Sequence, residues 1–161
     1  MSVLITGGAG YIGSHTVKAL KEQNFRPIVL DNFVFGNEFI IKNVLKVPYI
    51  NGQVGDKELI FNLLNGSHEL TSSDPVIGII HFAAYTSVRE SCINPLAFYK
   101  NNFTQTLNLL EILVNKNEKD SSNIPIVFSS SCATYGIPSQ NPISEETLQK
   151  PISPYGKSKL M

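Results

Sequence analysis

Cysteine is scarce in this 161-residue sequence, and neither sign of charge is in excess. Thirteen Lys and Arg residues balance thirteen Asp and Glu residues, so the formal net charge is zero. Without a basic excess, there is no electrostatic reason to expect nucleic acid or an anionic membrane as a partner. The two cysteines, Cys92 and Cys132, are too few for a disulfide framework and lack the paired spacing of a zinc site. We therefore expect a reducing, cytoplasmic environment and no bound metal.

Long apolar runs are also missing. No stretch approaches the roughly 18 apolar residues that a membrane-spanning helix needs. The first apolar stretch, 3–5, ends in glycines and follows no basic segment, which argues against a signal peptide. The length and the 42% content of hydrophobic residues are instead typical of one globular domain. We expect a single domain over residues 1–161, with no membrane partner.

Short apolar runs alternate with longer stretches of helical periodicity, as in a parallel sheet built from strand–helix–strand units. The expected strands cover residues 2–6, 27–31, 49–54, 76–81 and 126–130. The expected helices cover residues 11–23, 38–45, 57–64 and 95–114. The pattern predicts an α/β fold with a doubly wound parallel sheet, in which the last two strands are buried on both faces.

The longest expected helix depends on apolar side chains spaced three or four residues apart. These are Leu96, Tyr99, Phe103, Leu107, Leu110 and Val114. Residues 66–75, 115–125 and 137–154 are expected to be weakly structured. The last of these is long and rich in proline, which favours a functional loop.

A glycine-rich turn follows the first expected strand. Gly7, Gly8, Gly10 and Gly13 satisfy two spacings typical of dinucleotide-binding turns, and Asp31 ends the next strand 18 residues after Gly13. Glycines permit close approach of the backbone to a pyrophosphate, and the following helix offers its N-terminal N–H groups. The alternative is a turn that merely connects a strand to a helix.

Two acidic residues follow this turn along the chain. Asp31 would accept hydrogen bonds from ribose hydroxyls and repel a 2′-phosphate, which favours NAD over NADP, although it could be an ordinary turn residue. Asp56 could reach an adenine amino group or simply cap the helix that begins at Lys57.

Tyr155 and Lys159 lie four residues apart and share one helix face. A phenol ordinarily titrates near pH 10, so a tyrosine that acts as a base near neutrality requires nearby positive charge, which a lysine supplies. Ser131, after the fifth strand, could hydrogen-bond a reacting oxygen or satisfy backbone groups. Cys132 is expected to be a packing residue, and His15, His68 and His81 are expected to be structural.

Seven blocks together resemble the extended short-chain dehydrogenase/reductase family over nearly the whole chain. They are 7–13, 31–32, 55–56, 81–84, 101–102, 129–136 and 155–159. Within this family the pattern is most similar to that of the UDP-sugar 4-epimerases that act on UDP-glucose.

The resemblance implies a Rossmann-like NAD-binding domain. It assigns cofactor binding to Gly7, Gly10, Tyr11, Ile12, Gly13, Asp31, Asn32, Asp56, Phe82, Ala83, Ala84, Asn101, Tyr155 and Lys159. It implies that Tyr155 is the catalytic base, that Lys159 is its electrostatic partner and that Ser131 orients the sugar 4-OH.

The implied reaction interconverts UDP-glucose and UDP-galactose through a 4-keto sugar, with NAD regenerated in each turnover. Dehydratases of the family carry an Asp-Glu pair where this chain has Cys132 and Ala133, so dehydration is disfavoured. Thr86 replaces a lysine found in some epimerases. Epimerisation of UDP-glucuronate or UDP-arabinose remains an alternative.

Family members continue past the Tyr-Lys helix into further strands and a C-terminal domain that holds the UDP-sugar. We therefore expect an N-terminal fragment that includes an incomplete NAD-binding domain, and a possible homodimer when the protein is full length. A non-catalytic or split dinucleotide-binding module is the alternative from another class. Net oxidation of a nucleotide sugar, with release of NADH, is a third.

Overall fold

The computed structural model describes residues 1–120 and 122–161. They form two compact units, each of which is described by itself. Unit 1 comprises Met1–Ala83 and Gln105–Ser129, and unit 2 comprises Ala84–Thr104 and Ser130–Met161.

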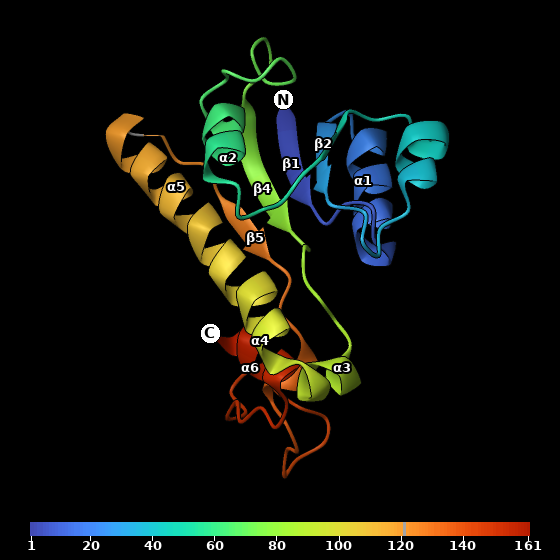
Figure 1. Ribbon diagram of the computed structural model, residues 1–161, viewed down its shortest axis with the longest axis vertical. Coiled ribbons are helices and arrows are strands. Elements are labelled where there is room, and N and C mark those ends of the chain that lie inside the picture. The colour runs from blue at the N-terminus through green and yellow to red at the C-terminus, as the bar shows by residue number, and fades with distance from the viewer. Residues whose placement is uncertain (121) are drawn as a thin grey trace. The chain divides into compact units, whose positions relative to one another are not determined.

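Unit 1 is built on a five-stranded parallel sheet with the strand order β3-β2-β1-β4-β5 (Figure 1). The strands are β1 (Ser2–Thr6), β2 (Arg26–Asp31), β3 (Tyr49–Asn51), β4 (Val76–His81) and β5 (Ile126–Phe128). The order reverses direction at β1, which lies between β2 and β4. This arrangement confirms the prediction of a doubly wound, Rossmann-like parallel sheet.

Helices cover both faces of this sheet because alternate strand residues point to opposite sides. Leu4 and Leu30 join one buried cluster with residues of α2 (Lys57–Leu64) and α5 (Gln105–Asp120). Val3, Ile5 and Val29 join a second cluster with Val17 of α1 (Tyr11–Glu22) and Ile41 of η1 (Ile40–Leu45). The buried strands are therefore apolar on both faces.

The strand predictions need two corrections. β3 and β5 end at Asn51 and Phe128, three and two residues earlier than expected. The fifth strand is not buried on both faces, since Val127 is 61% exposed and Phe128 38% exposed. β5 lies at an edge of the sheet and pairs with β4, whose His81 ring stacks on Phe128. Ile77 of β4 is also 40% exposed, so full burial was wrong for the fourth strand as well.

The long helix differs from its prediction in three ways. It consists of α4 (Pro95–Phe98), the π-helical turn η2 (Tyr99–Thr104) and α5. It continues to Asp120, so 115–120 is helical rather than weakly structured. Finally, Leu96, Leu107 and Val114 of the predicted apolar stripe are exposed, while Phe98, Asn102, Leu109 and Leu113 are buried. The helix has apolar side chains on two faces, and periodicity alone does not say which one packs.

Unit 2 contains the remaining helices. They are α3 (Val88–Ile93), which the sequence analysis missed, α4, η2, the 3₁₀ turn η3 (Cys132–Thr134) and α6 (Pro154–Leu160). Residues 137–153 contain no helix or strand, which confirms the irregular segment before Pro154. Ser153 caps α6 by accepting a hydrogen bond from the Gly156 N–H at 3.0 Å, and Pro154 occupies the first helical turn. α6 packs against α3, α4, η2 and η3, and this packing stabilises so short a helix.

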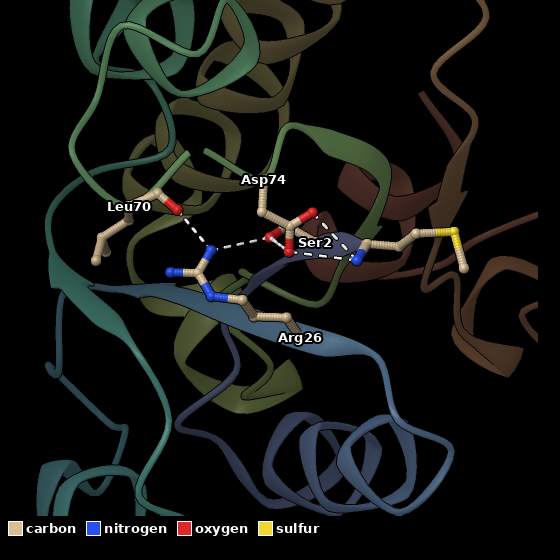
Figure 2. Close-up of polar contacts among 5 residues, drawn as sticks. Ser2, Arg26, Leu70 and Asp74 are labelled. Carbon is tan, nitrogen blue, oxygen red and sulfur yellow. Dashed lines mark hydrogen bonds and ion pairs between the residues drawn. The ribbon is translucent and has the colours of Figure 1, made fainter. Parts of the chain in front are cut away.

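A charged cluster joins the first residues of the chain to β2 and to the segment before β4 (Figure 2). The Met1 amino group lies 3.1 Å from Asp74 Oδ1, and Ser2 Oγ donates to Asp74 Oδ2 at 3.0 Å. Arg26 Nη1 donates to Ser2 Oγ at 3.0 Å and to the Leu70 carbonyl at 2.6 Å. The hydrogen bond from the Met1 ammonium is the main reason that the pKa of Asp74 is lowered.

We expect Asp74→Asn to lower the free energy of unfolding by about 1 kcal/mol at pH 7, because this pair is partly exposed and screened. A lowered pKa in the folded state stabilises the fold above the ordinary aspartate value and ceases to do so as pH falls through the lowered value. The difference from the wild type should therefore shrink towards pH 2. Urea unfolding at pH 7 and pH 2 would measure it, with the exposed Glu69→Gln as control. An equal loss at both pH values would contradict the role of the charge.

Candidate functional site

The glycine-rich turn lies directly after β1, the central strand of unit 1. Gly7 has a φ of +71°, and a Cβ there would lie 2.5 Å from the Ala83 amide nitrogen. A Cβ on Gly13 would collide with the Gly7 carbonyl oxygen. These two positions require glycine, because the turn is folded against both α1 and the segment that follows β4.

The amino end of α1 is open to an anion. Gly10 is the N-cap and offers no side-chain hydrogen bond, and the first turn holds no acidic residue. A Cβ on Gly10 would meet a single atom at 3.4 Å, the Gly7 carbonyl oxygen. Tyr11 and Ile12 begin the helix with exposed side chains. A pyrophosphate could therefore approach these backbone N–H groups, which are favoured anion ligands.

Asp31 supports this turn as well as ending β2. Its Oδ2 accepts a hydrogen bond from the Ala9 N–H at 3.0 Å, and its Oδ1 accepts one from the Phe33 N–H at 2.9 Å. The side chain is 8% exposed. A carboxylate oxygen has two lone pairs, so each oxygen can also accept from a ribose hydroxyl. Neighbouring Asn32 donates to Gln53 Oε1 at 3.3 Å.

The carboxyl ends of the strands are aligned by backbone hydrogen bonds. The Gly7 N–H donates to the Leu30 carbonyl and the Phe82 N–H to the Thr6 carbonyl, both at 2.8 Å. Phe82 and Ala83 therefore lie beside the glycine turn, and both are partly buried. Ligands of such sheets bind outside this edge.

Asp56 caps α2, which is one of the two roles expected for it. Its Oδ1 accepts a hydrogen bond from the Leu59 N–H at 3.0 Å, and the side chain is exposed. His81, expected to be structural, is buried between the hydroxyls of Thr6 and Thr106, at 2.5 and 2.9 Å from its Nδ1 and Nε2.

Tyr155 and Lys159 lie on α6 in unit 2, as the four-residue spacing predicted. Their exposed fractions are 9% and 7%. Burial lowers the pKa of Lys159 from 10.5 to about 8, because the charged form loses its hydration. A Cβ on Gly156 would lie 2.5 Å from the Ala133 carbonyl oxygen, so α6 and η3 are in close contact.

Ser131 is the N-cap of η3. Its Oγ accepts a hydrogen bond from the Ala133 N–H at 3.2 Å, so it does satisfy a backbone group, and a hydroxyl can donate a second bond elsewhere. Cys132 is exposed, so its prediction as a packing residue was wrong: η3 turns this side chain outward.

Sequence reasoning missed Asn102, which is 3% exposed. Its side chain accepts from the Tyr85 N–H at 2.7 Å and donates to the Tyr85 carbonyl at 2.9 Å and to Ser158 Oγ at 3.0 Å. Asn101, the predicted neighbour of the cofactor, donates to Asn102 Oδ1 at 3.0 Å. Asn102 thus joins the segment that begins with Ala84 to the helix that carries Tyr155. The Asn-Asn pair was visible in the sequence, but its partners were not.

Two further observations concern the described part of the chain. Nowhere in residues 1–120 and 122–161 do three or more His, Cys, Asp or Glu side chains gather closely enough to hold a metal ion. Among the same residues, no helix combines the length and apolar character needed to cross a membrane.

The fold and the glycine turn define a Rossmann-like nucleotide-binding protein. Residues 4–161 match the family model described as GDP-mannose 4,6 dehydratase, and the chain belongs to this family.

Known proteins similar to the chain include several sugar-nucleotide epimerases. It is 39% identical to a UDP-glucose 4-epimerase of Lactobacillus helveticus over 100% of this chain and 44% of that protein. It is 36% identical to a probable UDP-arabinose 4-epimerase of Oryza sativa subsp. japonica over 99% of this chain and 38% of that protein. A crystal structure of UDP-glucose 4-epimerase from Brucella ovis in complex with NAD aligns with a TM-score of 0.83 and 38% identity, covering 99% of this chain and 44% of that one.

The chain is therefore a relative of UDP-sugar 4-epimerases and spans less than half the length of the relatives named here.

Proposed function

We propose that this chain is the dinucleotide-binding part of an NAD-dependent UDP-sugar 4-epimerase that interconverts UDP-glucose and UDP-galactose. The observation that carries the proposal is the Tyr155–Lys159 pair, buried on one short helix. Epimerisation at a carbinol carbon by oxidation and reduction needs one group that both removes and returns a hydroxyl proton. A tyrosine with a lysine one turn away suits that task.

The cofactor would be held by the residues at the carboxyl edge of the sheet. Gly7, Gly10, Tyr11, Ile12 and Gly13 would receive the pyrophosphate, because this turn brings the backbone close and leaves the amino end of α1 open. Asp31 would bind the adenosine ribose and exclude a 2′-phosphate. Support for NAD also comes from the Brucella ovis relative, which binds it.

The remaining residues are proposed to contact the cofactor on the basis of the family pattern. They are Asn32, Asp56, Phe82, Ala83, Ala84, Asn101, Tyr155 and Lys159.

In the proposed mechanism, the Tyr155 oxygen accepts the proton of the sugar 4-OH. Bound NAD supplies the acceptor, and later the donor, of the hydride at C4. Lys159 places a positive charge one helical turn from Tyr155, and Ser131 Oγ orients the sugar oxygen by a hydrogen bond. Tyr155 then returns its proton to the oxygen of the 4-keto sugar after this has turned over. The exposed Cys132 and partly buried Ala133 carry no carboxylate, so the residues present do not supply the acid–base pair of a dehydratase.

The second candidate is a binding module that lacks activity without another chain. It is favoured by the glycine turn and Asp31, which suit dinucleotide binding without any acid–base residue. UDP-arabinose is the alternative substrate, supported by the Oryza sativa relative.

Exposed Leu107 and Val114 on α5 support a homodimer, which the mass in solution would test. Exposed, unpaired Cys92 and Cys132 support a cytoplasmic location.

We expect the native gene product to interconvert UDP-glucose and UDP-galactose without releasing NADH, because the hydride returns to the same sugar. Intact mass would first establish the length of that product, and the 161-residue chain would be assayed beside it. Sugar products would be followed by chromatography and NADH by absorbance at 340 nm, with UDP-arabinose as a parallel substrate. Release of one NADH for each sugar converted would instead favour net oxidation of the nucleotide sugar. NAD binding without turnover in either length would favour the binding module.

A further inference from the structure

Two side-chain amides of α5 hold the backbone of Gly55, which lies between β3 and α2. The Gly55 N–H donates to Gln105 Oε1 at 3.1 Å, and Asn108 Nδ2 donates to the Gly55 carbonyl at 3.2 Å. Gln105 and Asn108 are three residues apart and so lie on one face of the helix. Together they bind both polar groups of one residue, as a neighbouring strand would.

This contact depends on glycine at position 55. A Cβ there would lie 2.9 Å from Gln105 Cγ and 3.2 Å from Gln105 Cβ. The close approach fixes the peptide immediately before Asp56. One residue beyond Asp56, Lys57 Nζ of α2 forms a partly exposed ion pair with Glu111 Oε2 of α5 at 2.6 Å.

Asp56 is the residue whose place this contact determines. The Leu59 N–H occupies its Oδ1, and a carboxylate has a second oxygen that also accepts hydrogen bonds. β2 and β3 are parallel, and the Gly52 N–H donates to the Asp31 carbonyl at 3.0 Å. The chain therefore leaves β3 at the edge where Asp31 ends β2.

We propose that Gln105 and Asn108 are positioning residues for adenine recognition by Asp56. This inference rests on the proposed function, since it needs a bound NAD. The two amides hold the turn so that the Asp56 carboxylate accepts a hydrogen bond from the adenine amino group. A hypoxanthine base presents a carbonyl oxygen at that position, and a carboxylate cannot donate to it.

The experiment compares the dissociation constants of NAD and of nicotinamide hypoxanthine dinucleotide, measured by calorimetry on the native gene product. We expect the wild type to bind NAD about tenfold more tightly, the value typical of a hydrogen bond to a charged group. Gln105→Ala/Asn108→Ala should bring this ratio towards one, by weakening NAD while leaving the hypoxanthine dinucleotide within about twofold. Asn115→Ala, an exposed amide of the same helix, is the matched control and should keep the wild-type ratio.

Three further variants separate positioning from stability. Asp56→Ser keeps a helix cap, but its side chain is too short to reach the base, so it should lower the ratio of the two dissociation constants as the double variant does. Adding Asp56→Ser to the double variant should not change this ratio further. Gln105→Glu retains the acceptor for the Gly55 N–H and should keep the ratio. Asn108→Asp removes the donor to the Gly55 carbonyl and should bring the ratio towards one. These two changes test the same contacts if the alanine variants do not fold.

Each outcome decides the matter. Equal weakening of both dinucleotides would show a purely structural role and overturn the inference. The inference would also be overturned by an unchanged ratio in the double variant, or by a wild type that binds the two dinucleotides equally. In both cases NAD would still bind, so the proposed function would stand. A wild type that binds neither dinucleotide would overturn the proposed function itself, and this inference with it.

Discussion

Replacing Tyr155 by phenylalanine is expected to reduce the turnover of UDP-galactose by about 10³-fold, the range for loss of a general acid–base group. The phenol is the proposed proton acceptor, and phenylalanine has no group that can take this role. The ring is 9% exposed, so phenylalanine preserves most of its packing and the fold should be retained. Steady-state kinetics with UDP-galactose would measure the effect.

The control for this variant is Tyr49→Phe. Tyr49 is partly buried in unit 1, donates a hydrogen bond to Glu38 Oε1 at 2.8 Å and has no proposed role in turnover. Its turnover should equal that of the wild type, and NAD affinity should change less than about twofold in both variants. A Tyr155→Phe protein with normal turnover would exclude Tyr155 as the base.

Replacing Lys159 by methionine is expected to separate activity from stability. Turnover should fall by about 10²-fold or more, because the proposed base Tyr155 loses its proposed positive partner. The free energy of unfolding at pH 7 should rise, since burial of the ammonium is unfavourable. Lowering the pKa from 10.5 to about 8 corresponds to roughly 3 kcal/mol, which is the ceiling of the expected gain.

The dependence on pH follows from the direction of this pKa change. Between pH 8 and 10.5, the unfolded lysine still carries a proton that the folded lysine has lost, so wild-type stability rises with pH. Below pH 8 both states are protonated and Lys159 contributes no slope. The methionine variant should lack the rise. Urea unfolding from pH 7 to 10 would measure it.

Lys157→Met is the matched control, because Lys157 is an exposed lysine on the same helix. It should keep the wild-type pH profile of stability. A Lys159→Met protein that keeps the wild-type rise in stability between pH 8 and 10 would contradict an unfavourable buried charge.

These expectations concern a function that combines two units, and each unit contributes a different part. Unit 1 provides the glycine turn, with Asp31 supporting it through Ala9. Unit 2 provides the proposed acid–base pair, on a helix that is joined through Ser158 and Asn102 to the Tyr85 backbone. Dinucleotide binding and proton transfer can therefore be tested by separate variants.

The sequence by itself determined the features that depend on neighbouring residues. The spacing of Gly7 and Gly13 indicates the turn, because a tight turn and close backbone approach depend on local geometry. A four-residue spacing puts Tyr155 and Lys159 on one face of any helix. Alternating apolar runs indicated the parallel sheet, since strands covered on both faces must be apolar on both.

Only the tertiary structure decided which residues hold these features in place. Gln105 and Asn108 contact Gly55 across 50 and 53 residues of sequence, and Asn102 contacts Ser158 across 56. No periodicity records such pairs. The long helix illustrates the same limit: its buried face, with Leu109 and Leu113 inward and Leu107 and Val114 outward, follows from the surface it packs against. Side-chain packing between distant segments, rather than local propensity, makes these choices.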